Sequence, residues 1–152
     1  MNNKGVTLIE LIVVFVIIAL MALLMVPNIG AWLPNYRLRS ATRDIVSAMR
    51  NAQMKAISNN GRQYLVNFNV GTDSYILQYT TGGLVFPDGP VQTAPSGITI
   101  NIAGLPGGTA TFNTDSTCLN GGNITLSYQK GGVIQNQRGI FLNAATGRVR
   151  IQ

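Results

Sequence analysis

The segment that decides the fold lies near the amino terminus and reads Val6-Thr-Leu-Ile-Glu-Leu-Ile-Val-Val-Phe-Val-Ile-Ile-Ala-Leu-Met-Ala-Leu-Leu-Met-Val26. Glu10 is its only charged residue. As a helix this segment extends about 31 Å, which matches the hydrocarbon thickness of a bilayer. A signal peptide is the alternative, but its apolar region is normally shorter, and no small-residue cleavage site follows Val26. The sequence therefore predicts a retained transmembrane helix over residues 6–26.

The composition of the whole chain argues against enzymatic chemistry. The chain has 152 residues, with 11 Lys and Arg, 5 Asp and Glu, one Cys and no His. A zinc site of the usual His/Cys type and a Ser-His or Cys-His nucleophile pair therefore cannot be built. The five acids are scattered along the sequence, and Cys118 has no partner for an intrachain disulfide. We expect no catalytic residues, no metal site and no cofactor, with Cys118 acting as a small apolar residue.

Glu10 is the most informative single residue. A carboxylate inside a membrane-spanning segment is costly, so by default it marks a function. A free amine at the start of a neighbouring chain's helix would balance its charge, which requires cleavage between Gly5 and Val6. The run Lys4-Gly5-Val6-Thr7-Leu8-Ile9-Glu10 resembles the class III signal of type IV pilins and type II secretion pseudopilins.

This resemblance implies a leader peptide over residues 1–5. A prepilin peptidase at the inner membrane would cut after Gly5 and methylate Val6, a position where the family usually has Phe. Glu10 would then dock subunits of one filament to each other. The implied partners are other pilins or pseudopilins and an inner-membrane assembly platform. The resemblance also implies that the carboxy-terminal domain is periplasmic and that assembly places the protein in a pilus or pseudopilus. The charge bias alone favours the reverse orientation, since three arginines at positions 37, 39 and 43 follow the apolar helix.

Residues 27–61 predict a second, amphipathic half of the helix. Pro27 and Pro34 are expected to kink it or open it locally. An apolar stripe comprises Leu38, Ala41, Ile45, Ala48, Ala52 and Ala56, with Met49 and Ile57 beside it. Three arginines at positions 39, 43 and 50 lie opposite the stripe, on a face that is solvated or contacts subunits, anionic lipid headgroups or nucleic acid. The helix is expected to end at Asn59-Asn60-Gly61.

Residues 62–152 predict an antiparallel β domain with many short strands separated by turn residues. Four Gly-Gly pairs punctuate it, and Lys130-Gly131-Gly132 predicts a tight hairpin. The fold class is thus α+β and type IV pilin-like, with a long helix packed on a sheet or small sandwich. The expected strands are 64–70, 75–79, 98–103, 110–112, 124–129, 133–135, 139–142 and 148–151.

Close to its carboxyl end the sequence reads Gly147-Arg148-Val149-Arg150-Ile151. In a strand, Val149 and Ile151 would point inward and the two arginines outward, where they could contact successive phosphates. Stretches along the helix and this ending resemble the branch of H-type minor pseudopilins and FimT minor pilins. The leading interpretation is a non-enzymatic minor subunit of a type II secretion pseudopilus or type IV pilus. The alternative is a minor pilin that binds double-stranded DNA for uptake in natural transformation through Arg148 and Arg150, with Arg138 and Lys130 extending the patch.

Overall fold

The computed structural model describes residues 5–24, 29–58 and 61–152, so Pro27 and the predicted helix end at Asn59-Asn60 lie outside the described residues. The chain divides along the sequence into one unit up to Leu33 and a second from Pro34 onward. In the first unit, helix α1 spans Leu8–Leu24. Its large apolar side chains from Leu8 to Leu23 are all at least half exposed. No helix in the described part of the chain combines the length and apolar character that a membrane crossing requires.

Helix α2 spans Ile29–Ser58 and runs through Pro34, which therefore does not end it. The predicted stripe is confirmed along most of its length, because Leu38, Ala41, Ile45, Met49, Ala52 and Ala56 are buried. Ile57 differs from the prediction, since it is about half exposed near the end of the helix. Ala48 is only partly buried, whereas Val46 and Thr42, which the pattern did not include, are buried. The hydroxyl of Thr42 donates to the carbonyl of Leu38 at 2.7 Å, which satisfies it inside the core.

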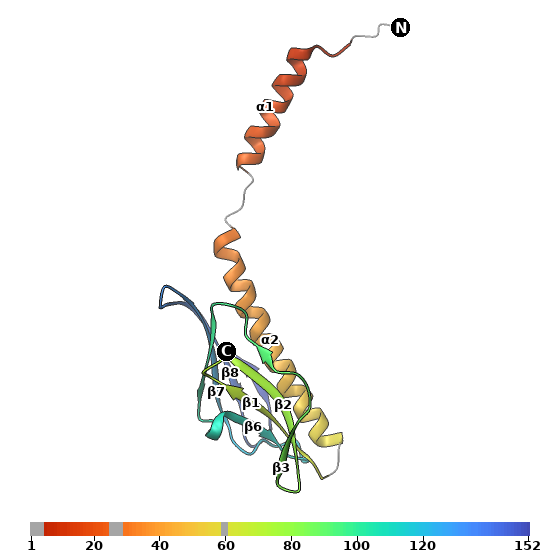
Figure 1. The fold of residues 1–152 in the computed structure, drawn as a ribbon, viewed down its shortest axis with the longest axis vertical. Helices are drawn as coiled ribbons and strands as arrows, with labels where there is room; N and C mark the ends of the chain where they lie inside the picture. The colour runs from red at the N-terminus through yellow and green to blue at the C-terminus, as the bar shows by residue number, and fades with distance from the viewer. Residues whose placement is uncertain (1–4, 25–28, 59–60) are drawn as a thin grey trace. The chain divides into compact units, whose positions relative to one another are not determined.

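The β domain contains two antiparallel sheets (Figure 1). The first has the order β3-β2-β1-β6, with β4 also pairing with β2, and the second has the order β5-β7-β8-β9. The strands of the first sheet are β1 Gln63–Asn69, β2 Ser74–Thr81, β3 Leu84–Pro87, β4 Gln92–Thr93 and β6 Thr109–Phe112. Those of the second are β5 Ile98–Ala103, β7 Gly122–Lys130, β8 Val133–Leu142 and β9 Val149–Ile151, and a short 3-10 helix, Pro106–Gly108, precedes β6.

Two features of the strand prediction were wrong. Strands β3 and β4 were not predicted, because Pro87 and Pro90 mark this region as a turn-rich loop. The predicted strands 133–135 and 139–142 form the single strand β8. Polar residues from Asn136 to Arg138 suggested a break, but the pairing with β7 continues past them.

Two of the Gly-Gly pairs form matching hairpin turns. Gly82 and Gly83 join β2 to β3, and Gly131 and Gly132 join β7 to β8. All four have positive φ, between 59° and 79°, which is the conformation that a tight two-residue hairpin needs at both central positions. The hairpin predicted at Lys130 is therefore confirmed.

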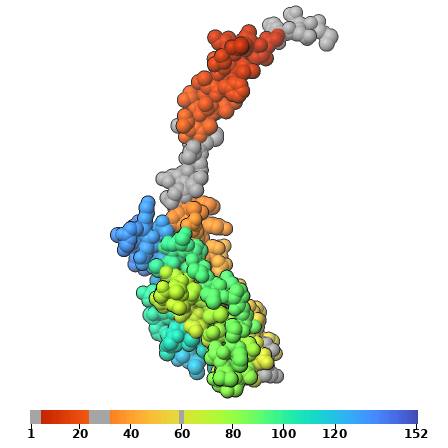
Figure 2. Space-filling model, viewed as in Figure 1, coloured from red at the N-terminus to blue at the C-terminus, as the bar shows by residue number. Residues whose placement is uncertain are grey.

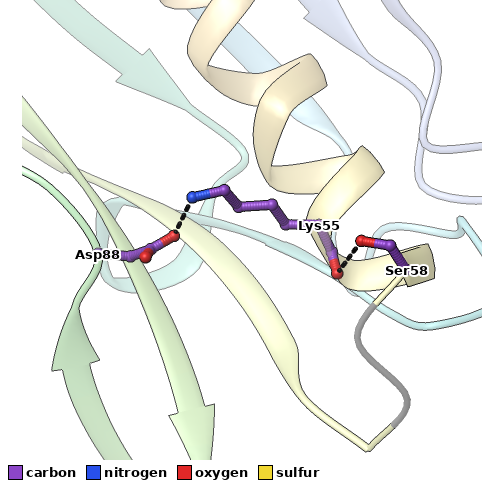
Figure 3. A network of polar contacts seen from close by, with 3 residues as sticks. All are labelled: Lys55, Ser58 and Asp88. Atoms are coloured by element: carbon purple, nitrogen blue, oxygen red, sulfur yellow. Dashed lines mark hydrogen bonds and ion pairs between the residues drawn. The ribbon is translucent and has the colours of Figure 1, made fainter.

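One apolar core joins α2 to both sheets. Buried residues of α2 pack in a single cluster with Val66 and Phe112 of the first sheet and Leu126 and Ile140 of the second. Cys118 belongs to this cluster, and burial raises the pKa of its thiol. At the carboxyl end of α2, Lys55 Nζ lies 2.7 Å from Asp88 Oδ2, and the Ser58 hydroxyl donates to the Lys55 carbonyl (Figure 3). A partly exposed ion pair of this kind contributes about 1 kcal/mol or less.

Candidate functional site

The amino-terminal motif forms the start of α1. Gly5 is exposed, and a Cβ built on it would meet nothing within 4 Å. Thr7 caps the helix: its Oγ1 accepts a hydrogen bond from the backbone N–H of Glu10 at 3.4 Å, and its carbonyl accepts one from Leu11. The side chain of Glu10 is exposed. The structure thus places Gly5, Val6 and Glu10 within a short accessible stretch at one end of an apolar helix.

The Thr7 cap is a feature that the sequence reasoning missed. Thr7-Leu8-Ile9-Glu10 has the spacing of a capping box, in which a Thr accepts from the N–H of a Glu three residues later. That spacing was a signal available in the sequence. Glu10 therefore has a local structural role through its backbone, which leaves its carboxylate free to serve another purpose.

The surface of α1 is apolar on every side. Such a helix is normally buried among other helices or in lipid. Within the described residues up to Leu33, its exposed side chains from Leu8 to Leu23 have no such cover. Glu10 is the only acid among them, so a partner that covers this surface must also accommodate one carboxylate.

The carboxy-terminal arginines lie together on one face of the second sheet. Strand β9 pairs with β8, with Arg150 opposite Phe141 and Val149 opposite Leu142. Arg148 and Arg150 line a hollow of about 230 Å³ together with Phe141, Asn143 and Thr146. Within the described part of the chain, neither guanidinium has an ion-pair or hydrogen-bond partner. The prediction that the two arginines share an exposed face agrees with this geometry.

Ile151 and Arg138 differ from the expectation. Val149 is buried as predicted, but Ile151 is 44% exposed, because it pairs with Ile140 at the open end of the edge strand. Arg138 pairs with buried Leu126 and lies two residues before buried Ile140. Alternation along the strand therefore puts Arg138 on the core-bearing face, opposite to Phe141 and the two arginines. Arg138 does not extend the pair.

Gly147 holds the arginine strand in place. Its φ is +59°, and a Cβ there would run into the Ser116 carbonyl oxygen and the Gln53 side-chain nitrogen. Gln53 Nε2 donates to that same carbonyl at 3.0 Å, so α2, the loop at Ser116 and the start of β9 meet at this glycine. The glycine of the Gly-Arg-x-Arg ending thus has a packing role, which the sequence alone did not reveal.

The comparisons with known proteins concern the amino-terminal motif and the fold. Residues 1–26 match the family described as the prokaryotic N-terminal methylation motif. No curated protein matches the chain. Among solved structures, the minor pseudopilin EpsH of the type 2 secretion system of Vibrio cholerae is similar, with 13% identity, a TM-score of 0.64, and coverage of 76% of this chain and 96% of that one.

A second solved structure has a similar fold. It is the type IV minor pilin FimU of Pseudomonas aeruginosa, with 13% identity, a TM-score of 0.58, and coverage of 78% of this chain and 90% of that chain. The methylation motif and the pilin-like α+β fold together support the type IV pilin and pseudopilin superfamily. Both of these structures are of minor subunits, and the chain shares their fold.

Proposed function

We propose that this chain is a minor pilin or pseudopilin, a structural subunit and not an enzyme, that is cut between Gly5 and Val6 by a prepilin peptidase. Residues 6–26 then hold it in the bacterial inner membrane, with the β domain in the periplasm, until the assembly platform adds it to a filament. The observation that carries the proposal is the capped helix α1, apolar on every side and bearing one exposed carboxylate near its start.

The chemistry of Glu10 supports this assembly step. Cleavage after Gly5 creates a free amine at Val6, and a carboxylate in an apolar environment is stabilised by an opposite charge. A neighbouring subunit's amino terminus supplies that charge when two such helices pack side by side. The charge pair then favours one axial offset between adjacent helices over others.

Processing is tested by expressing the full chain with and without a prepilin peptidase and measuring the intact mass. We expect loss of residues 1–5 and addition of one methyl group only when the peptidase is present. A Gly5→Leu variant should remain uncut, whereas Gly89→Leu, at a glycine whose Cβ would meet nothing within 4 Å, should be cut normally. A chain that keeps Met1 in the presence of an active peptidase overturns the proposal.

Assembly is tested with Glu10→Gln in cells that carry the matching pilins and assembly platform. We expect the uncharged variant to be processed but not recovered in sheared filaments, and Glu10→Asp to recover part of the incorporation. Normal incorporation of Glu10→Gln would show that the carboxylate has no role in docking.

A second candidate function, binding of double-stranded DNA during uptake, is favoured by the exposed and unpaired Arg148 and Arg150. Two guanidinium groups on one face can contact successive phosphates without regard to base sequence. We expect the full chain in detergent to retard duplex DNA of any sequence, and Arg148→Gln with Arg150→Gln to weaken binding and reduce its salt dependence. The double variant Arg43→Gln with Arg50→Gln removes the same charge from α2 and is the control; an equal effect of both pairs would exclude a specific role for β9.

A further inference from the structure

Polar contacts tie helix α2 to the β domain along two of its flanks. On one flank, Arg37 donates to the Ser96 hydroxyl at 3.3 Å, and Lys55 pairs with Asp88. These two basic residues share a flank because they are about five full turns apart. On the opposite flank, Gln53 donates to a carbonyl of the loop between β6 and β7. The outer side of α2 lies between these two flanks.

A line of exposed residues on this outer side is called here the arginine seam. Its members are Arg39, Arg43, Arg50, Met54 and Ile57, and all five are exposed. At about 100° per residue they fall within an arc of about 60°, so they form one line about 27 Å long. Figure 1 shows α2 along one side of the β domain, and in Figure 2 its orange and yellow atoms reach the surface there.

The arginines of the seam are unpaired. Within the residues that the structure describes, their guanidinium groups form no ion pair and no hydrogen bond. Asp44 follows Arg43 in the sequence, but it lies about 100° further round the helix, toward the flank of Lys55. Burial and, after it, the negative charge of Asp44 raise the pKa of the Tyr75 hydroxyl above its ordinary value. Asp44 is therefore close to strand β2 and does not serve the seam.

The other acids from Pro34 onward have partners of their own. Asp73 accepts a hydrogen bond from the Ile100 N–H at 2.7 Å, and Asp88 forms the ion pair already described. Asp115 accepts hydrogen bonds from the backbone and hydroxyl of the residue two positions later. None of these acids pairs with the seam. Its three positive charges are therefore not balanced within the described part of the chain, and they are complementary to a row of carboxylates.

The composition of the seam indicates a protein partner. Its charges are all arginines, which bind carboxylates in a bidentate way and are enriched with methionine in protein interfaces, whereas lysine is depleted there. Met54 is 63% exposed and Ile57 49% exposed on the same line. A nucleic-acid backbone presents a charge at every step and does not match this apolar end. A protein surface can place carboxylates beside the arginines and apolar side chains beside Met54 and Ile57.

The geometry of the seam fits a helix from another protein. A helix that packs on α2 at a crossing angle of about 20° can follow a straight line over several turns. Arg39 and Arg43 are four residues apart, and Arg43 and Arg50 are seven apart, so carboxylates at the same spacings can face them. Neither helix of this chain has such a row, since α1 contains only Glu10 and α2 only Asp44. A second copy therefore does not fit the seam.

We propose that the arginine seam docks an α-helix of a different subunit, and that this helix carries carboxylates along one face at spacings of four and seven residues. The three arginines bind those carboxylates, and Met54 and Ile57 pack on apolar residues that continue the same line. The inference rests on the proposed function, because it requires a filament of several kinds of subunit. Charge pairing selects the neighbour and disfavours contact between the seams of two identical chains.

The test places the photo-crosslinker p-benzoylphenylalanine at Met54 of the full chain, in cells that carry the matching pilins and assembly platform. Val133 on β8 is the control position, because it is 60% exposed and lies outside α2. We expect position 54 to crosslink to a different subunit. Mass spectrometry of the joined peptides should locate the adduct in a helix whose Asp or Glu residues recur at the proposed spacings. Position 133 should not crosslink to that helix.

The charge requirement is tested by Arg43→Glu, with Lys130→Glu on the β7–β8 hairpin as the matched charge reversal. Like charges then face each other in the seam, so Arg43→Glu should lower the crosslink yield from position 54 about tenfold. Arg43→Gln, which removes the charge without reversing it, should cause a smaller loss, and Lys130→Glu should cause none. Changing the facing carboxylate of the mapped helix to Arg should restore the crosslink to the Arg43→Glu chain.

The outcomes separate the seam from the proposed function. A parent chain that is neither processed nor recovered with pilins overturns both. A chain that is incorporated overturns the seam alone if position 54 crosslinks no more than position 133, or crosslinks to a second copy, nucleic acid, lipid or a helix without carboxylates. A yield that Arg43→Glu leaves unchanged also overturns the seam. A crosslink to an acidic helix that is lost in Arg43→Glu and restored by the exchanged partner supports both.

Discussion

The two helices of this protein differ in how much of their own apolar surface is buried. Helix α2 buries one stripe, from Leu38 to Ala56, against both sheets and leaves the arginines at positions 39, 43 and 50 exposed. Helix α1 has apolar residues on all sides and leaves every large one at least half exposed. Contacts within the chain therefore stabilise α2, whereas the proposed function assigns the cover of α1 to lipid or to other subunits.

The largest expected loss of stability comes from removing a buried side chain of α2. Met49 is fully buried, so Met49→Ala should lower the free energy of unfolding of the β domain by about 2–5 kcal/mol. Ile12→Ala removes a half-exposed side chain of α1 and should leave this value unchanged. Urea unfolding of the full chain in detergent, followed by the near-ultraviolet circular dichroism of the buried tyrosines, measures both. Equal losses in the two variants would contradict the distinction.

A second prediction compares two glycines. Gly147→Ala should destabilise the domain by about 1–3 kcal/mol, because the new methyl group meets the Ser116 carbonyl and the Gln53 side chain. Gly5→Ala has open space around it and should not change the stability. The same urea titration applies. Unchanged stability of Gly147→Ala would show that β9 and the loop at Ser116 can separate without cost.

A third prediction concerns the Thr7 cap at the start of α1. Thr7→Ala removes the oxygen that accepts from the Glu10 N–H and should weaken the first turn of α1 by about 0.5–2 kcal/mol. Amide hydrogen exchange of residues 8–11 in detergent micelles should become faster, while exchange in β7 and β8 stays the same. Thr7→Ser, which keeps the hydroxyl, is the control. Slow exchange in Thr7→Ala would mean that the cap does not hold the turn.

The smallest expected effect concerns pH. Hydrogen bonds from the Thr117 side chain and backbone lower the pKa of Asp115, so the folded state favours its ionised form. Its contribution to stability is therefore complete above the carboxyl's unfolded pKa and is lost as the pH falls through the folded value. The stability of Asp115→Asn should depend less on pH in this acidic range. Parallel pH profiles of the two proteins would contradict this assignment.

The sequence predicted most of what depends on periodicity and little of what depends on long-range contact. The stripe of α2, strand β5 and the hairpin at Gly131 follow from local spacing and turn chemistry, and the structure confirms them. The positions of Ile151 and Arg138 depend on which strand pairs with which, and at what register. That information is not local, so no window of sequence could supply it.

The candidate sites show the same division. The leader motif could be recognised because its residues are contiguous, and its described members Gly5, Val6 and Glu10 are exposed at the start of α1. The role of Gly147 could not be predicted, because Gln53 and Ser116 are far from it in sequence. Assignment of processing, docking and DNA contact to particular residues stays a prediction until the experiments above are done.

The edges of the two sheets have a consequence for a molecule proposed to polymerise. Open strand edges template unwanted fibres, and here each edge is obstructed. Strand β9 has only three residues, with Arg148 before it and Arg150 within it, and β3 ends in Pro87. The Asp73 carboxylate accepts a hydrogen bond from the Ile100 N–H of β5, and the Leu119 N–H donates one to the Thr111 carbonyl of β6. Growth by sheet extension is thereby disfavoured, so the route left for self-association runs through the helix and not through amyloid-like stacking.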